Sequence, residues 1–355
     1  MKLHHRIAAA TLATLVLAGP AAAQDNKLRL LTWADYAPKE VVAQFTKETG
    51  IAVEITLSNN EEMISKLRAT GGAGFDLVQP SQDRITGPQQ EFGIYKPMDL
   101  AKLKTGLFIP SMLEATKKNT TLAGKVYGVP HIWGTDGLVV NTKLARMADY
   151  PDLCKPEYKG KTAVRLKRPT LLAFAFAAGK NPFALYGDAK AYAALMDEVG
   201  KTVAACKGNL KFFWDNKDQL LNGMRSGEIV GAMMWDTGGW KLNGENAEIQ
   251  YIAPKSGALG WIDTFALPAK GRNDAAAYAW INFVMRPEIA AKVAASAGNF
   301  TASKGADKLM DAKLKSQFAA SFPEAALKNV KWYPAVPAGI EEIEGRVLDR
   351  IKAAN

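Results

Sequence analysis

Histidine and cysteine are scarce in this chain of 355 residues. It has three histidines, of which His4 and His5 lie near the N-terminus, and two cysteines. Downstream of residue 23 only His131 remains, so a metal site with several histidines and a His-dependent acid–base scheme are both excluded. His131 stands beside Pro130 and close to Trp133. We expect it to be a packed or turn residue.

Motifs of common enzyme classes are also absent. The chain has no Gly-x-Ser-x-Gly elbow, no His-Glu-x-x-His and no Gly-x-Gly-x-x-Gly. Gly160-Lys161-Thr162 resembles the end of a phosphate-binding loop, but Lys155 occupies the position of that loop's first glycine. We therefore expect no enzymatic activity, no cofactor and no bound metal.

Positive charge is in excess but is not concentrated. The 45 Lys and Arg exceed the 35 Asp and Glu, which gives a formal net charge of +10. The basic residues are scattered, often in pairs such as Lys117-Lys118, and no basic arm or basic helix is present. A well-solvated surface explains this pattern better than nucleic-acid binding does.

Long apolar runs are missing after residue 23, so no membrane-spanning segment is expected there. The first 23 residues have the features of a secretory signal: Lys2 and Arg6, an apolar run over 7–17, and small residues at 21–23 before Gln24. We expect this segment to be cleaved and the rest to be exported to a bacterial periplasm, with membrane contact only through a partner.

Cys154 and Cys206 are the only two cysteines. A disulfide between them fits an oxidising compartment, and in the chain-entropy model it would stabilise the fold by about 4 kcal/mol. The alternative is two buried free thiols.

Strand and helix patterns alternate from residue 28. Apolar runs at 28–32, 51–57 and 75–78 indicate strands, and helical spacing covers 38–49 and 60–69. This order predicts a parallel sheet with right-handed crossovers. Turns are predicted at 127–130 and 134–137, the second leading into another α/β unit that starts with a strand at 138–141. No long linker separates the two units.

Four tryptophans stand close to predicted strand ends. Trp33 and Trp235 directly follow strands, Trp133 precedes the predicted turn at 134–137, and Trp261 precedes a late strand. Ligands of open α/β sheets bind at the carboxyl ends of strands. Carboxylates accompany the rings at Asp35, Asp236 and Asp263. Ring faces and carboxylates together favour an ammonium ligand. The alternative is that the tryptophans only fill the core.

At these residues the chain resembles the polyamine-type (spermidine/putrescine) periplasmic solute-binding proteins of ABC importers, over nearly the whole length after residue 23. The resemblance is carried by four stretches: Leu31-Thr32-Trp33-Ala34-Asp35-Tyr36, Gly74-Phe75-Asp76-Leu77-Val78-Gln79-Pro80-Ser81, Gly227-Glu228-Ile229 leading to Trp235, and Trp261-Ile262-Asp263-Thr264-Phe265-Ala266-Leu267-Pro268.

The resemblance implies a type II binding-protein fold, in which two α/β lobes joined by crossing strands enclose a ligand cleft. We expect one lobe from 24–137 plus 262–302 and the other from 138–261 plus 303–355. A monomer would deliver a small amine or amino acid to the permease subunits. The resemblance further implies that Trp33, Trp235 and Trp261 sandwich the ligand, that Asp35 and Asp263 hold amino groups, and that Tyr36 and Ser81 form hydrogen bonds.

Three positions depart from the family pattern. Gly238 stands where an acid is usual, although Asp236 is near, and Phe300 replaces a tyrosine. A loop expected to carry a glutamate reads Arg165-Leu166-Lys167-Arg168-Pro169-Thr170. A cationic group about 4 Å from a misplaced charge loses about 4 kcal/mol at an effective dielectric constant near 20.

The basic loop opens an alternative ligand. A zwitterionic ω-amino acid of the 4-aminobutyrate type would place its ammonium on Asp263 and its carboxylate on Arg165 or Arg168. The loop could instead face solvent. More remote alternatives are a metal-binding relative on the same scaffold, which would need paired tyrosines that the sequence lacks, and a secreted enzyme.

Overall fold

The first part of the described chain follows the expected alternation of strands and helices. The computed structural model describes residues 26–354, so the expected signal segment lies outside the described residues. The leading elements are β1 (Lys27–Thr32), α1 (Lys39–Thr49), β2 (Ala52–Leu57), α2 (Asn60–Thr70) and β3 (Leu77–Val78). β1 pairs in parallel with both β2 and β3. The predicted parallel arrangement is therefore confirmed.

Local sequence explains where these helices begin and end. Pro38, whose φ suits a helix start, precedes α1, and the Asn59 side chain accepts a hydrogen bond from the Glu62 amide at the start of α2. Gly50 and Gly71 end the two helices in the left-handed conformation, with φ of 73° and 60°. Glycine adopts that conformation without the steric cost of a side chain.

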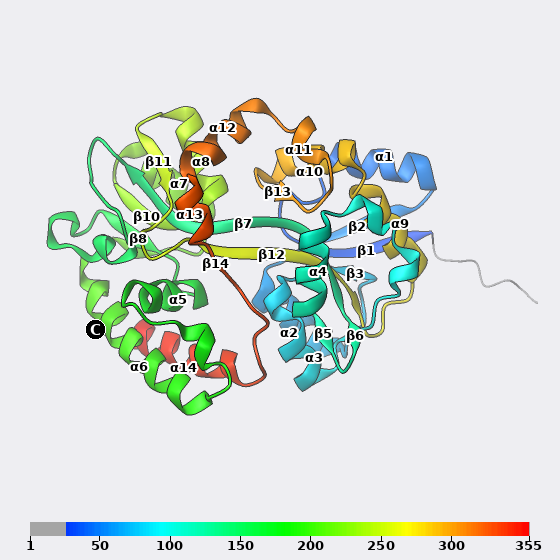
Figure 1. Ribbon diagram of the computed structural model, residues 1–355, viewed down its shortest axis with the longest axis horizontal. Coiled ribbons are helices and arrows are strands. Elements are labelled where there is room, and N and C mark those ends of the chain that lie inside the picture. The colour runs from blue at the N-terminus through cyan, green and yellow to red at the C-terminus, as the bar shows by residue number, and fades with distance from the viewer. Residues whose placement is uncertain (1–25, 355) are drawn as a thin grey trace, which may run out of the picture.

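Two long antiparallel strands, β7 (Gly128–Asn141) and β12 (Leu259–Pro268), run through the middle of the molecule and join two α/β lobes (Figure 1). The turns predicted at 127–130 and 134–137 are wrong, because β7 begins at Gly128 and runs without a break through 134–137. Glycine is needed at two positions of β7 because of packing, not because of a turn. A Cβ at Gly134 would meet the Trp261 ring, and a Cβ at Gly137 would meet Tyr251. Glycine in a strand here permits close approach of aromatic rings.

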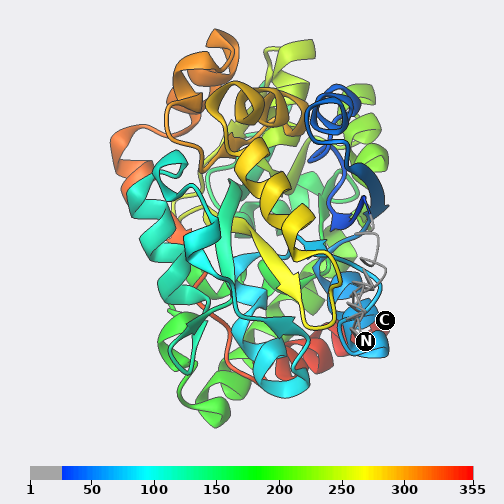
Figure 2. The same ribbon diagram turned by 90° about the vertical axis from the view of Figure 1, so that its right-hand side faces the viewer.

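A single twelve-stranded sheet spans both lobes, with the main order β2-β1-β3-β12-β7-β10-β8-β9. The other elements around the blue and cyan strands are α3 (Thr86–Phe92), β4 (Tyr95–Lys96), α4 (Pro110–Asn119), β5 (Thr121–Leu122), β6 (Lys125–Val126), α9 (Asp274–Val284), α10 (Pro287–Ala297), β13 (Phe300–Thr301) and α11 (Ala306–Leu309). We call this side the first lobe. In the end-on view of Figure 2, α9 folds back beside β12.

The second lobe lies at the other end of β7 and β12 (Figure 1). Its elements are β8 (Thr162–Val164), α5 (Arg168–Ala177), α6 (Ala189–Cys206), β9 (Phe212–Phe213), α7 (Lys217–Ser226), β10 (Gly231–Trp235), α8 (Asp236–Glu245), β11 (Ile249–Ile252), α12 (Ala312–Ser321), α13 (Glu324–Lys328), β14 (Lys331–Trp332) and α14 (Ile340–Ala353). The expected two-lobed α/β fold is confirmed, while the residue boundaries given for the lobes stay a prediction.

Each lobe has its own hydrophobic core. In the first lobe, Phe45 of α1 packs against Trp280 and Phe283 of α9, with ring centroids 5.0 and 5.3 Å apart. In the second lobe, fully buried Leu171 and Met196 bring α5 and α6 into one cluster. Burial of such side chains contributes about 1.5–3 kcal/mol each. Two separate cores leave each lobe able to move as a body about the strands that join them.

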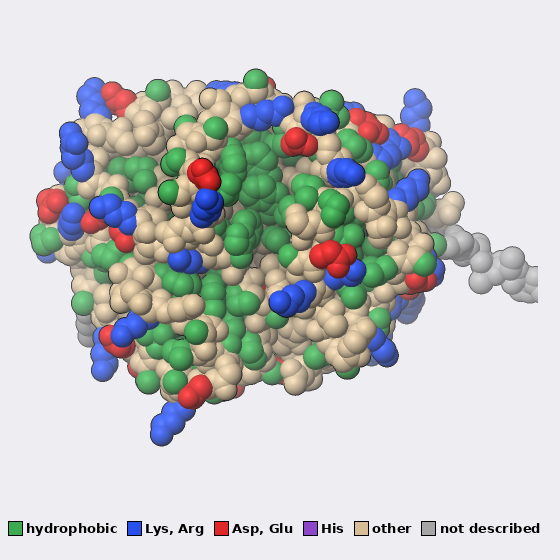
Figure 3. All heavy atoms as spheres, in the orientation of Figure 1, with side chains coloured by type: hydrophobic (Ala, Val, Ile, Leu, Met, Phe, Trp, Pro, Cys, Tyr) green, Lys and Arg blue, Asp and Glu red, His purple; other side chains and the backbone are tan. Residues whose placement is uncertain are grey.

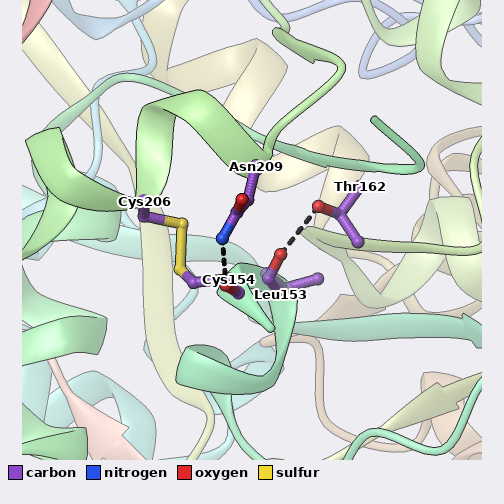
Figure 4. The surroundings of a disulfide bond; sticks show 5 residues. All are labelled: Leu153, Cys154, Thr162, Cys206 and Asn209. Atoms are coloured by element: carbon purple, nitrogen blue, oxygen red, sulfur yellow. Dashed lines mark hydrogen bonds between the residues drawn. A yellow bond between two sulfur atoms is a disulfide. The ribbon is translucent and has the colours of Figure 1, made fainter. Parts of the chain in front are cut away.

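The expected disulfide between Cys154 and Cys206 is present (Figure 4). It ties the 3₁₀ helix at Tyr150–Cys154 to the last residue of α6. The Thr162 hydroxyl donates to the Leu153 carbonyl at 2.7 Å, which connects the same segment to the start of β8. The disulfide therefore helps to fix the strand that leads into the basic loop.

No helix among residues 26–354 has both the length and the apolar character needed to cross a membrane.

We predict that the double substitution Cys154→Ser and Cys206→Ser lowers the free energy of unfolding by about 4 kcal/mol, because the disulfide closes a long loop in the unfolded chain. Urea unfolding of both proteins measures the difference. Reducing agent should destabilise the unsubstituted protein and leave the double variant unchanged. Equal stability of the two proteins under oxidising conditions would contradict this role.

Candidate functional site

A cavity of about 270 Å³ lies between the two lobes. Its walls come from the segments that follow β1, β3, β8 and β10 and from the middles of β7 and β12. These segments meet there because the carboxyl ends of the parallel strands of both lobes point toward the junction. We call this cavity the cleft.

Asp263, on β12, is a buried acidic group of the cleft, with 3% of its surface exposed. Its carboxylate accepts hydrogen bonds from the Tyr36 hydroxyl and from the Ser81 hydroxyl, each at 2.6 Å. Burial raises its pKa to about 7, and no basic residue among 26–354 acts to lower that pKa. Asp263 is thus a buried carboxylate without a cation, oriented by two neutral donors.

The groups behind Asp263 fix this arrangement. Asn60 donates to the Ser81 hydroxyl at 2.9 Å and accepts from the Ser81 amide at 3.0 Å. The Tyr36 ring packs edge-on against His131, with centroids 5.6 Å apart. Burial lowers the pKa of His131 to about 3, so the imidazole is neutral. The expectation that His131 is a packed residue is confirmed.

A second buried carboxylate of the cleft, Asp136, was missed by the sequence analysis. It lies in β7 and is 5% exposed. Burial raises its pKa to about 7, although the charge of Arg165 acts in the opposite direction. The signal was an acid within the residues of a strand, but the flanking Gly134 and Gly137 led to a predicted turn at 134–137.

Three of the four tryptophans line the cleft. Trp33 follows β1, and its indole N–H donates to the Gln79 carbonyl at 2.8 Å. Trp235 ends β10 and rests edge-on against Trp214 at 5.2 Å between centroids. Trp261 enters from β12. The structure therefore brings together the three rings that the family resemblance assigned to a ligand sandwich.

Trp133 does not belong to the cleft. Neighbouring residues of a strand point to opposite faces, and Gly134 faces Trp261 of the cleft, so Trp133 points away. It stacks on Phe300 at 4.9 Å and contacts Phe318 and Trp332 edge-on, each at 5.9 Å. The sequence-based assignment of Trp133 to the ligand site is corrected accordingly. On the face of the molecule that Figure 3 presents, apolar side chains gather between the two lobes.

Asp236 likewise faces protein and not the cleft. Its two carboxylate oxygens accept hydrogen bonds from the Thr135 amide and hydroxyl, the Thr237 amide and the Asn299 side chain, at 2.7–3.1 Å. Burial raises its pKa to about 7 despite these donors. Asp236 therefore connects β7 to the start of α8, and its sequence-based assignment to the ligand site is corrected too.

Asp35 stands at the rim of the cleft with a half-exposed side chain. It has φ of 70°, a left-handed conformation that asparagine and aspartate adopt more readily than other residues with side chains. Its carboxylate lies 3.5 Å from Lys217 Nζ at the start of α7. The pair joins the two lobes at the mouth, so Asp35 has a cation before any ligand arrives.

The basic loop contributes two arginines with different surroundings. Arg168 is 4% exposed, and its guanidinium donates to Asp83 at 2.5 Å, to Glu344 at 3.0 Å and to Tyr186. It is therefore fully engaged, and the expectation that it could hold a ligand carboxylate is wrong. Arg165 instead lies over the Trp235 ring, 4.9 Å from its centroid, and its buried Nε has no hydrogen-bond partner among the residues that the structure describes.

Ion pairs close one side of the cleft; the Asp83–Arg168 pair is buried, whereas the Glu341 side chain is 36% exposed. Asp83 and Arg84 belong to the 3₁₀ helix Gln82–Arg84 of the first lobe. Asp83 binds Arg168 of the second lobe, and Arg84 binds Glu341 of α14 at 2.6 Å. Breaking a buried pair by removing one partner costs about 3–5 kcal/mol. These contacts hold the two lobes in register around the cleft.

Tyr333 of the cleft also lay outside the sequence analysis. It follows β14, is buried beneath Arg168 and has a hydroxyl without a hydrogen-bond partner among residues 26–354. No motif in the local sequence marks it. Within the same residues, no group of three or more His, Cys, Asp or Glu side chains is arranged to hold a metal ion.

The family of bacterial extracellular solute-binding proteins matches residues 40–321. The spermidine/putrescine-binding periplasmic protein of Escherichia coli is 30% identical over 341 residues, covering 94% of each chain. The putrescine-binding periplasmic protein PotF of the same organism is 26% identical, covering 84% of each chain.

A solved structure described as a putative spermidine/putrescine ABC transporter from Listeria monocytogenes has the same fold. Its TM-score is 0.81 at 23% identity, and the alignment covers 93% of this chain and 100% of the other. The resemblance seen in the sequence is thereby confirmed. The family model matches most of the chain, and the Escherichia coli relative is 30% identical over 94% of it. The chain therefore belongs to the bacterial extracellular solute-binding proteins.

Proposed function

We propose that this protein is the periplasmic binding component of an ABC importer, and that it captures a small primary amine, such as a polyamine, in the cleft and delivers it to the membrane permease. The names of the relatives support this role, since those described above bind spermidine or putrescine and are periplasmic. The protein would act as an exported monomer after cleavage of its N-terminal signal, and without catalysing a reaction.

One observation carries the proposal: Asp263 is a buried carboxylate without a cation, in a cleft walled by indole rings. Burying an unpaired charge is costly, and the raised pKa of Asp263 reflects that cost. A ligand ammonium would supply the missing charge, and the faces of Trp33, Trp235 and Trp261 would add cation–π attraction and apolar contact. Tyr36 and Ser81 hold the carboxylate in place for this contact.

Capture requires movement of the lobes, because the cleft lies between them. In an open form the ligand would reach Asp263 on one wall, and closure would bring up the second wall with Trp235. Ligand contacts to both walls favour the closed form in proportion to the difference in affinity between the two forms. The closed surface, in turn, is what a permease would recognise.

A zwitterionic ω-amino acid is a second candidate ligand. The observation that favours it is Arg165, which lines the cleft and forms no ion pair within residues 26–354. Such a ligand still has the primary ammonium that the role of Asp263 requires.

Calorimetric titration of the purified protein with putrescine, spermidine and 4-aminobutyrate tests the proposed function. We expect at least one of these amines to bind, while succinate and ribose, which have no ammonium, do not. Failure of all three amines to bind would overturn the proposal.

We predict that Asp263→Asn weakens binding of whichever of these three amines the unsubstituted protein binds best by about 2–3 kcal/mol, because it removes the charged partner of a desolvated ammonium. Asp349→Asn on the exposed face of α14 is the matched control and should leave the affinity unchanged. If Asp263→Asn binds the amine normally while its fold and thermal stability are retained, the ammonium lies elsewhere.

We further predict that Trp33→Ala weakens amine binding by about 1–3 kcal/mol through the lost cation–π and apolar contact. Trp133→Leu should change affinity little, because Trp133 points away from the cleft. Titrations followed by tryptophan fluorescence distinguish the two variants, since the emission change on amine binding should persist in Trp133→Leu. A larger loss of affinity for Trp133→Leu than for Trp33→Ala would contradict the placement of the site.

A further inference from the structure

The charged side chains that line the cleft balance. Five are acidic and five are basic: Asp35, Glu61, Asp83, Asp136, Asp263, Arg84, Arg165, Lys167, Arg168 and Lys217. This balance alone does not decide the ligand, because Arg84, Arg168 and Lys167 also pair with Glu341, Glu344 and Asp215 behind the lining. Desolvated charges need partners, so the ligand has to fit the charges that the protein itself leaves uncompensated.

Most of these charges already have partners. Asp35 pairs with Lys217 at 3.5 Å, Glu61 with Arg84 at 3.6 Å, and Asp83 with Arg168 at 2.5 Å. Lys167 reaches Asp215 outside the cleft, at 3.8 Å. Among residues 26–354, the lining charges left without an ion pair are therefore Asp136, Asp263 and Arg165.

Asp263 and Arg165 lie on different walls, while Asp136 is in β7, the strand paired with β12. Asp263 is in β12 beside Ser81 of the first lobe, whereas Arg165 is on the loop after β8 of the second lobe. The charge of Arg165 lowers the pKa of Asp136, but no basic residue of the described chain, 26–354, contributes to the pKa of Asp263. The uncompensated positive charge is thus separated from the more enclosed carboxylate.

Hydrogen-bond donors point to the same asymmetry. The buried Arg165 Nε and Trp261 Nε1, both in lining residues, are N–H donors without a partner within 26–354; the Tyr333 hydroxyl, which can donate or accept, and the acceptor Asp83 Oδ1 are unpartnered there too. A protonated diamine or polyamine offers only donors and could not satisfy the two N–H groups. A carboxylate offers two acceptor oxygens, and a guanidinium is the side chain best suited to bind it.

We infer that the ligand of this cleft is an amino carboxylate, whose ammonium binds Asp263 and whose carboxylate binds the guanidinium of Arg165. This inference rests on the proposed function and narrows its ligand class. Asp136, which also lines the cleft, would accept from the ammonium or from a further donor of the ligand. Arg165 would then be the residue that separates zwitterions from dications.

Charge explains why the discrimination is large. A second ammonium at the position of the carboxylate would meet Arg165 in place of an anion, and like charges there repel. It would also leave the donors of Arg165 unsatisfied, and sites with unsatisfied buried polar groups reject the wrong ligand strongly. We expect the preference for a zwitterion over a diamine of similar length to reach about a hundredfold or more.

The experiment is a calorimetric comparison of three ligands of similar length: 4-aminobutyrate, putrescine and butylamine. We expect 4-aminobutyrate to bind at least about tenfold more tightly than butylamine and about a hundredfold more tightly than putrescine. Glycine and 6-aminohexanoate extend the series if the distance between the charges differs. Tighter binding of putrescine than of every zwitterion would overturn the inference while leaving the amine-binding function intact. No binding of any amine would overturn both.

Arg165→Gln tests the assigned residue. It should lower the affinity for 4-aminobutyrate by about tenfold to a hundredfold and leave that for butylamine nearly unchanged, which removes the preference. Lys190→Gln, which removes one exposed positive charge at the start of α6, is the control. An unchanged preference in folded Arg165→Gln would overturn the role of Arg165. The ligand comparison on the unsubstituted protein decides the inference even if the variant does not fold.

Discussion

The site depends on a carboxylate that the protein buries without giving it a cation. Asp263 is held by two neutral hydroxyl donors, from Tyr36 and Ser81, and burial raises its pKa to about 7. This is a costly arrangement for a folded protein, because a buried charge needs compensation. The cost is offset when a ligand ammonium enters, so the same interaction that destabilises the empty cleft provides affinity.

The rest of the cleft makes this contact selective. Indole rings from both lobes line the cleft, and in the proposed function they would surround the ammonium when the lobes close about β7 and β12. The other charges are neutralised by ion pairs, several of which cross between the lobes, as Asp83 with Arg168 and Arg84 with Glu341 do. What the ligand meets is therefore a small set of uncompensated groups and not a broadly acidic surface. This is why a chain whose relatives bind polyamines can favour a zwitterion.

Much of this could be predicted from the sequence. Alternating strands and helices with terminal prolines and glycines indicated the α/β order, and Trp33, Trp235, Trp261 and Asp263 were placed by their positions at strand ends and by the family resemblance. Contacts between distant segments could not be predicted. Gly134 and Gly137 suggested a turn because the rings that need the space, Trp261 and Tyr251, are far away in sequence. Arg165 and Arg168 looked equivalent until the partners of Arg168 were known.

Proton release on ligand binding tests the central claim most directly. A carboxyl with a pKa of about 7 is partly protonated at neutral pH, and an ammonium beside it lowers that pKa, so protons leave when the amine binds. Calorimetry at about pH 7 in buffers of different ionisation enthalpy should show release of about half a proton or more per site, with affinity rising from about pH 6 to about pH 8. The release should shrink in Asp263→Asn. A binding heat that does not depend on the buffer, together with an affinity that does not depend on pH over this range, would contradict the account.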